Sequence, residues 1–297
     1  MKSRFPVVLI ALMVAIFVSG CGSGSPGDEV ERFVVALRPD RDPDAMMEEK
    51  VALERFLRDR TGRPVEVIIP LSGAVIQEGL ANGTIDVAFV SATEAVRAAD
   101  AGVGGILLAT EINGRPYYES YWITLREAPY GNVEDLRGRP IAFSSRTSTS
   151  GMQVPVWDMV RRGLLAPTDR PEAFFGEGNV FYGTGYVSAA QRVLNGQAAA
   201  AAVSYYVLDK DKHLSAEDRS RLRRLASQGP VPTHVLCVRT SLHPADRIAL
   251  EAAFRALNEQ AADLRDRMFT GPLIEVDEET HLAPTREILA LLRSMPL

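Results

Sequence analysis

The sequence predicts an α/β fold in which strands and helices alternate, on the basis of three observations. Short apolar runs such as residues 32–37 (RFVVAL) and 85–90 (IDVAFV) are typical of buried strands. Between these runs lie longer stretches whose apolar residues recur at helical spacing. No segment repeats with a period of roughly 20–50 residues, which argues against a solenoid. Strands that alternate with helices indicate βαβ units around a largely parallel sheet.

The first half of the chain carries the clearest alternation. Strands are expected at residues 32–37, 65–69, 85–90 and 106–109, and helices at residues 45–60, 74–80 and 93–101. Gly62 should end the first helix and Asn82-Gly83 the second, because these residue types favour the left-handed backbone that closes a helix. The alternation then continues beyond residue 117.

The second half is expected to follow the same pattern. Strands are expected at residues 118–124, 141–143, 179–182, 198–203 and 235–238, and helices at residues 132–140, 148–163, 188–194, 244–264 and 284–292. The alanine-rich stretch 198–203 suits either state, and we favour a strand because Gly196 breaks the chain before it. Pro244 and Pro284 are placed at the first positions of the two closing helices, where proline is tolerated.

Composition excludes several functional classes. The 297 residues include 33 Lys+Arg and 38 Asp+Glu, a net charge of -5, so the chain lacks the basic balance of a nucleic-acid-binding protein. Its 2 cysteines, Cys21 and Cys237, are too far apart for a zinc ribbon or a disulfide framework. Its 4 histidines also lack the spacing of a helical metal pair. We expect no metal and no cofactor, and Cys237 is interpreted as a buried, inert thiol.

The N-terminus is typical of an exported protein. Lys2 and Arg4 precede 13 uninterrupted apolar residues at 6–18, fewer than the roughly 20 that cross a bilayer. The following Val18-Ser19-Gly20-Cys21 resembles a bacterial lipobox, whose cysteine is acylated and becomes the first residue of the mature chain. We therefore expect residues 1–20 to be a signal peptide and residues 21–31 to be lipidated Cys21 with a flexible leash. The alternative is cleavage elsewhere, with Cys21 incidental.

Hydroxyl side chains gather where a helix should begin. Residues 147–151 (TSTSG) follow the expected strand 141–143 and open the expected helix 148–163. One hydroxyl is enough to cap a helix, so several in succession suggest a further role. The free backbone amides and the positive end of the helix dipole attract an anion there, and extra hydroxyls can donate to its oxygens. A simple polar cap is the alternative interpretation.

Four motifs in order along the chain resemble one family. They are residues 82–89 (NGTIDVAF), 134–143 (EDLRGRPIAF), 148–155 (STSGMQVP) and 193–196 (VLNG). Together they are similar to the phosphate, phosphite and phosphonate solute-binding proteins of ABC transporters. The resemblance implies a type II periplasmic-binding-protein fold, with two α/β lobes, two crossover strands and a ligand cleft between the lobes. It places lobe one at residues 32–116 plus 234–297, lobe two at 117–233, and the crossovers near 117–124 and 233–239.

The same resemblance assigns the binding residues. It implies that Ser148, Thr149 and Ser150 hold the oxyanion, with Gly151 completing the turn. It also places Tyr118 near the hinge and facing the ligand, although simple strand packing would explain that side chain equally well.

The chain also departs from the family pattern. The usual tyrosine before the first motif is replaced by Gly73, and a histidine and an aspartate are missing around residues 183–186. Losing those groups makes an aminoalkylphosphonate ligand less suitable. Other polar residues are candidates to rebuild the pocket, namely Ser72, Ser91, Thr93, Tyr186, Ser204 and Tyr205, although each is also compatible with surface or packing roles. Arg146 is a candidate source of charge beside the helix start.

The resemblance predicts a receptor that captures a small oxyanion by cleft closure and delivers it to an ABC permease and its ATPase. The receptor is expected to be a monomer outside the cytoplasm, anchored to the membrane by its lipid. The chain has no G-x-S-x-G elbow and no S-x-x-K after Ser148, so we do not expect an enzyme. The alternatives are a sensor subunit of the same fold, a binder of a carboxylate or sulfonate, and a hydrolase that uses Ser148 or Ser150.

Overall fold

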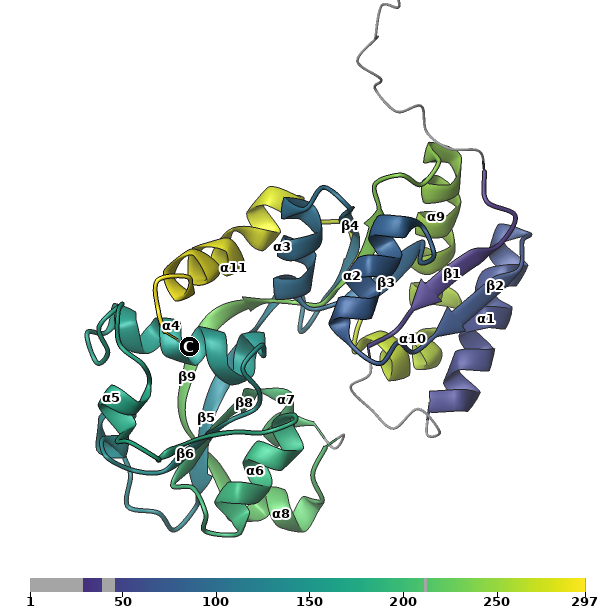
Figure 1. Ribbon diagram of the computed structural model, residues 1–297. Helices are drawn as coiled ribbons and strands as arrows, with labels where there is room; N and C mark the ends of the chain where they lie inside the picture. The colour runs from purple at the N-terminus through teal and green to yellow at the C-terminus, as the bar shows by residue number, and fades with distance from the viewer. Residues whose placement is uncertain (1–28, 39–45, 211–212, 297) are drawn as a thin grey trace, which may run out of the picture.

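The computed structural model describes residues 29–38, 46–210 and 213–296. They form two β-sheets, each covered by helices (Figure 1). The six-stranded sheet has the order β11-β4-β10-β3-β1-β2 and, with its helices, is called here the first lobe. The five-stranded sheet has the order β7-β6-β8-β5-β9 and, with its helices, is called the second lobe.

The first lobe is a sheet covered on both faces. Its strands are β1 (Phe33–Ala36), β2 (Val65–Ile68), β3 (Val87–Val90), β4 (Gly104–Thr110), β10 (Val235–Arg239) and β11 (Leu273–Ile274). Its helices are α1 (Met47–Thr61), α2 (Gly73–Asn82), α3 (Ala92–Asp100), α9 (Pro244–Gln260) and α10 (Ala262–Phe269). One apolar cluster packs the sheet against α1, α9 and α10, and another packs it against α2 and α3. Gly62 and Gly83 end α1 and α2 with left-handed backbone, as expected.

The second lobe has shorter elements. Its strands are β5 (Tyr117–Leu125), β6 (Ile141–Phe143), β7 (Val180–Tyr182), β8 (Ala200–Ser204) and β9 (Leu222–Pro232). Its helices are the 3-10 turn η2 (Glu134–Leu136), the π-helical turn η3 (Thr149–Gln153), α4 (Val154–Arg161), α5 (Glu172–Phe175), α6 (Tyr186–Leu194), α7 (Tyr206–Asp209) and α8 (Ala216–Arg221). Trp122, Phe143 and Phe175 form the centre of one of its apolar clusters.

The expectation of largely parallel sheets is wrong in detail. β1 runs parallel to β2 and β3, and β6 runs parallel to β7 and β8. However, β10 is antiparallel to β3 and β4, and β5 is antiparallel to β8 and β9. The chain passes from β4 of the first lobe into β5 of the second, and it returns from β9 of the second lobe into β10 of the first. β5 and β10, the strands that receive the chain from the other lobe, therefore run opposite to their neighbours.

Several elements differ from expectation. The strand β11 and the helices α5, α7 and α8 were not predicted, and the expected helix 148–163 is divided into η3 and α4. β9 was not predicted, and the expected helix 244–264 is divided into α9 and α10 at Ala261. The last helix, α11 (Glu278–Leu292), begins before Pro284 because Asp277 caps it by accepting from the Thr280 amide at 2.9 Å. None of the helices that the structure describes is long and apolar enough to cross a membrane. The expected signal peptide lies outside the described residues.

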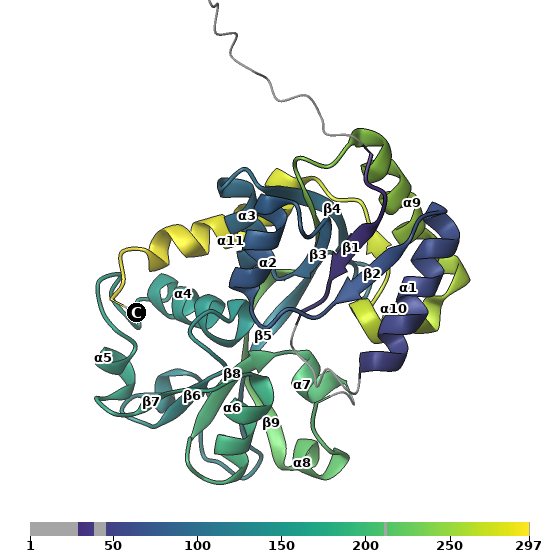
Figure 2. The same ribbon diagram turned by 45° about the vertical axis from the view of Figure 1, so that its right-hand side comes forward.

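Helix α11 packs on both lobes (Figures 1 and 2, in yellow). Leu282 is buried in a first-lobe cluster and Ile288 in a second-lobe cluster. Arg286 pairs with Asp100 of α3, and Glu287 accepts from the indole N–H of Trp157 in α4 at 3.3 Å. The chain segment expected to belong to lobe one therefore also completes the packing of the second lobe.

Candidate ligand-binding site

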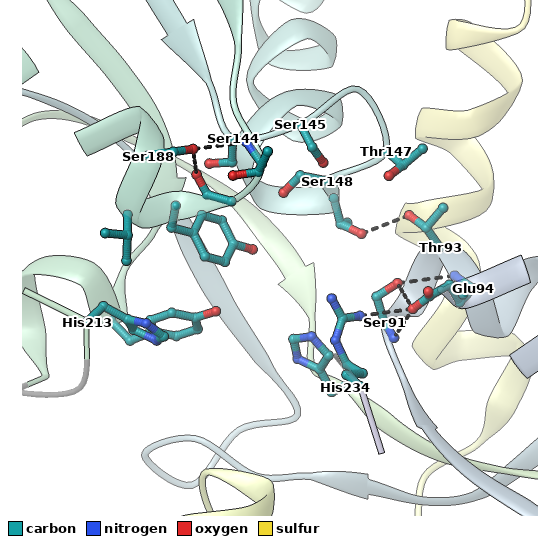
Figure 3. Close-up of a pocket in the computed structure, with 18 of the residues that line it drawn as sticks. Ser91, Thr93, Glu94, Ser144, Ser145, Thr147, Ser148, Ser188, His213 and His234 are labelled. Carbon is teal, nitrogen blue, oxygen red and sulfur yellow. Dashed lines mark hydrogen bonds and ion pairs between the residues drawn. The ribbon is translucent and has the colours of Figure 1, made fainter. Parts of the chain in front are cut away.

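A cavity of about 600 Å³ lies between the two lobes (Figure 3). The first lobe contributes the end of β1 and the starts of α2 and α3, and the second lobe contributes β5, the loop after β6 and the start of α6. We call this space the hydroxyl chamber, because its lining includes Ser91, Thr93, Ser144, Ser145, Thr147, Ser148, Thr149, Thr184 and Ser188. Such a lining offers many hydrogen-bond donors.

The hydroxyl-rich turn lies at the centre of this chamber. Ser148 caps η3, its Oγ accepting from the Gly151 amide at 3.0 Å. The loop is tied to β8 because the Ser144 hydroxyl donates to the Ala202 carbonyl at 2.7 Å. No acidic residue lies in the first turn of η3. The amides at this helix start therefore have neither intrahelical acceptors nor a neutralising carboxylate of their own turn.

The structure brings five of the eight expected binding residues to this chamber. Ser148, Thr149, Tyr118, Tyr186 and Ser91 all line it. Thr149 is buried, and its hydroxyl lies 2.8 Å from that of Thr93 on the opposite lobe. The Thr93 hydroxyl also donates to Oε1 of Gln153 at 2.7 Å. The two lobes thus touch directly beside the hydroxyl-rich turn.

Two expected residues lie behind the chamber wall. Ser150 is fully buried, and its hydroxyl lies 2.7 Å from the Tyr186 hydroxyl and accepts from the Tyr118 hydroxyl at 3.3 Å. Gly151 packs against Ser144: a Cβ at Gly151 would lie 2.4 Å from the Ser144 Cβ. Ser150 therefore positions the two tyrosines, and Gly151 allows the turn to approach the strand closely.

Other sequence candidates lie elsewhere. Tyr205 lines an adjoining cavity, while Ser72 is an exposed cap of α2 and Ser204 is fully buried in β8. Arg146 has two interpretations, charge beside the helix start or simple exposure, and the structure favours exposure because its side chain does not line the hydroxyl chamber. Its guanidinium instead lies 3.9 Å from the ring centre of Tyr182, which attracts the cation, and it lines a separate surface cavity.

The first-lobe side of the chamber has its own helix start. Ser91 caps α3, and Glu94 closes a capping box by accepting from the Ser91 amide at 2.9 Å. Glu94 also pairs with Arg38 at 2.9 Å, so the negative charge is balanced within the wall. The spacing Ser91-x-x-Glu94 is a capping-box signal that sequence reasoning could have used. Arg38, His213 and His234 come from separate segments, and no local pattern marks them as site residues.

Burial keeps the phenols of Tyr118 and Tyr205 neutral. It raises the pKa of the Tyr118 phenol above its ordinary range. It also raises the pKa of Tyr205 to about 12, with a smaller contribution from Asp209. Neutral phenols can donate hydrogen bonds at physiological pH. Among the described residues, no group of His, Cys, Asp and Glu is arranged to hold a metal ion. The Tyr118 phenol is therefore a neutral hydrogen-bond donor beside the hydroxyl-rich turn.

Comparison with known proteins identifies the family. The family model for the periplasmic substrate-binding proteins of phosphonate ABC transporters matches residues 35–280. The chain is 25% identical over 219 residues to the phosphate-import protein PhnD of Mycolicibacterium smegmatis, covering 70% of this chain and 68% of that protein.

Two solved structures share the fold. XAC2383 from Xanthomonas citri bound to ATP matches with a TM-score of 0.73 at 21% identity, over 89% of this chain and 98% of that chain. PhnD1 from Prochlorococcus marinus in complex with methylphosphonate matches with a TM-score of 0.73 at 14% identity, over 89% of this chain and 99% of that chain. The two lobes thus form a type II periplasmic-binding-protein fold.

The matched family consists of transport receptors that work outside the cytoplasm with a permease and an ATPase, and its members are not enzymes. This excludes the alternative of a hydrolase that uses Ser148 or Ser150. With a family model that matches most of its length, the chain belongs to the periplasmic substrate-binding proteins of phosphonate ABC transporters.

Proposed function

We propose that the hydroxyl chamber binds a phosphorus oxyanion at the start of η3. The observation that carries this proposal is a helix start with several hydroxyls and no acid of its own, facing an inter-lobe cavity. Hydrogen bonds to a charged oxygen contribute about 1.5–3 kcal/mol each, so a few of them account for micromolar binding. The named relatives support the choice of ligand, because phosphate, ATP and methylphosphonate all carry such an oxyanion.

Ser148 and Thr149 are the proposed direct contacts, with the hydroxyls of Tyr118 and Tyr186 beside them. Ser91 faces them from the first lobe. A ligand that touches both lobes binds the closed arrangement better than an open one and shifts the population toward it. Closure then presents the receptor to the permease, and we propose that it acts as a monomer.

Substitution of Ser148 tests the assigned site. Ser148→Ala removes a donor to the ligand and the cap on the Gly151 amide, so phosphate or methylphosphonate affinity should fall by about 1–3 kcal/mol. Ser215→Ala is the matched control, because Ser215 caps α8 in the same way but does not line the chamber. Calorimetry should show weaker binding only for Ser148→Ala. Equal affinities in both variants would refute the assignment.

The proposed lobe limits are residues 32–116 plus 234–297 and residues 117–233. The separation of the strands into two sheets at these points supports them, since β1–β4, β10 and β11 form one sheet and β5–β9 the other. The packing of α11 on both lobes suggests that its residues move with neither lobe alone.

Membrane attachment through Cys21 is a further part of the proposal. Cys21 lies outside the described residues, and its support is the lipobox-like sequence that follows the apolar run. Two or three acyl chains hold a protein at a membrane, whereas one binds only marginally. Cys21→Ala should therefore release the chain from the membrane fraction of cells. Membrane retention of this variant after a salt wash would contradict acylation.

A further inference from the structure

A second cavity continues from the hydroxyl chamber. It has a volume of about 400 Å³ and shares the lining residues Arg38, Tyr118, Tyr206, His213 and His234 with the first. Figure 3 shows His213 and His234 on the side of the hydroxyl chamber away from Ser144 and Ser148. Pockets of roughly 300–1,000 Å³ bury drug-sized ligands, so the two cavities together exceed what a bare tetrahedral anion would fill.

The second cavity has a different wall, and we call it the apolar chamber. Its lining includes Leu37, Met46, Phe89, Ile112, Tyr205 and Met268. All of these except Ile112 are at least nine-tenths buried in the protein, and both lobes contribute to the set. When an apolar group displaces water from a cavity with apolar walls, apolar surface is removed from water and binding becomes more favourable.

The charged residues of the apolar chamber balance one another. Lys210 and Arg265 match Glu111 and Asp266 in number, and Arg38, which lines both chambers, pairs with Glu94 at 2.9 Å. Arg265 pairs with Asp266 at 2.7 Å and also donates to the Asn258 carbonyl at 3.1 Å. With the formal charges cancelled, this chamber does not demand a charged substituent. The negative charge of a ligand would lie only in the hydroxyl chamber.

Aromatic rings line the passage between the two chambers. The Tyr205 ring centre lies 5.7 Å from that of Tyr118 and 5.6 Å from that of Tyr206. The Phe89 ring centre lies 5.4 Å from that of His234. Rings at such distances offer edges and faces to another planar group. The passage therefore suits a ligand whose ring is bonded directly to the anionic group.

We propose that the ligand is a phosphonate or phosphate ester with one uncharged organic substituent, planar or apolar, which occupies the apolar chamber. This inference rests on the proposed oxyanion site, because that site fixes the end of the ligand from which the substituent extends. Tyr205 is the specificity-determining side chain: it lines the apolar chamber and not the hydroxyl chamber.

Calorimetry with phosphate, methylphosphonate and phenylphosphonate tests the proposal on the wild-type chain, Tyr205→Leu and Tyr182→Leu. Tyr182 is a matched control because its half-buried ring lines neither chamber. Phenylphosphonate should bind wild type about tenfold or more tightly than methylphosphonate. Tyr205→Leu should weaken phenylphosphonate about three- to tenfold and change methylphosphonate by less than about twofold. Tyr182→Leu should preserve both affinities, and circular dichroism checks that each variant folds.

Two results overturn the inference while leaving the oxyanion site intact. One is methylphosphonate binding that depends on Ser148 without any preference for phenylphosphonate. The other is a phenyl preference that Tyr205→Leu does not reduce. If none of the three compounds binds wild type, the proposed function itself fails, and the inference fails with it.

Discussion

Two helix starts face each other across the hydroxyl chamber, and they are satisfied in opposite ways. On the first lobe, α3 carries Glu94 in its first turn, and this carboxylate accepts from the amide and hydroxyl of Ser91. On the second lobe, η3 has Ser148 as its cap and no acid in its first turn. The start of α3 therefore has a carboxylate in its own first turn, whereas the start of η3 has none.

This difference explains why the start of α3 can serve as a structural part of the chamber wall, whereas the start of η3 is available to an anion. We call the start of η3 the receptive start. Anions are favoured at both helix starts for the same physical reason. At α3, Glu94 also pairs with Arg38, so its charge is balanced within the wall. At η3, the proposed oxyanion would take the place that the Glu94 carboxylate has at α3. Each of the following predictions alters one side of this pair.

Gly151→Ala should have the largest effect, because it disrupts the receptive start. The added Cβ would lie 2.4 Å from the Ser144 Cβ, which cannot move without the backbone. The shift should cost about 1–3 kcal/mol of unfolding free energy and weaken oxyanion binding at least about tenfold. Gly131→Ala is the control, since its Cβ would meet only the Asp135 Oδ2 at 3.5 Å. Urea unfolding and calorimetry measure both effects, and unchanged affinity in Gly151→Ala would contradict the close-packing argument.

Glu94→Gln should make the two starts more alike. Removing the charge should lower the unfolding free energy by about 1 kcal/mol, because a partly exposed ion pair with Arg38 is lost. It should also tighten oxyanion binding by about 1 kcal/mol at low salt, since a like charge leaves the chamber wall. Glu134→Gln is the matched control, because Glu134 pairs with Arg162 outside the chamber. Weaker binding in Glu94→Gln would show that Glu94 supports the ligand rather than repelling it.

Tyr118→Phe should have the smallest effect at neutral pH, below about 1 kcal/mol, since it removes one long hydrogen bond to Ser150 behind the receptive start. The distinguishing effect of this substitution is on folding stability at alkaline pH. Burial raises the pKa of Tyr118 above its ordinary 10.0, so above pH 10 the unfolded chain releases a proton that the folded chain retains. The stabilisation is complete below pH 10 and is lost as pH rises, by at most about 1.4 kcal/mol per pH unit.

Tyr118→Phe should therefore lose stability less steeply than wild type above pH 10. Tyr117→Phe is the neighbouring control, because the Tyr117 side chain is exposed and should leave the slope unchanged. Denaturant titrations between pH 9 and pH 11 compare the three chains. Parallel slopes for all three would contradict the burial of this phenol.

Sequence patterns predicted the elements whose residues are locally distinctive. The apolar run 85–90 became β3 and the periodic stretch 45–60 became α1, each within a few residues. β9 escaped prediction because it is an edge strand with one neighbour, and its outward positions are polar and half-exposed. Such a strand carries no continuous apolar run. The directions of β5 and β10 were also missed, because only the crossing between sheets determines them.

The hydroxyl-rich turn was predicted as an anion site, but the side chains that face the cavity were not all identified. A π-helical turn has i→i+5 hydrogen bonds, so it directs its side chains differently from an α-helical turn. In η3 this leaves Thr149 facing the chamber and Ser150 turned inward toward Tyr118 and Tyr186. The winding depends on packing against Ser144, which lies outside the motif. Residues such as His234 were missed because only the tertiary fold brings them to the chamber.

The double packing of α11 has a consequence for biosynthesis. Leu282 fills a core of one lobe and Ile288 a core of the other, and both follow every described strand of either sheet in the chain. While the chain is still emerging from the ribosome or the export channel, neither core has its final side chains. Completion of both lobes must await the synthesis of α11, so a chain truncated before residue 278 should be recognised by quality-control proteases as two unfinished halves.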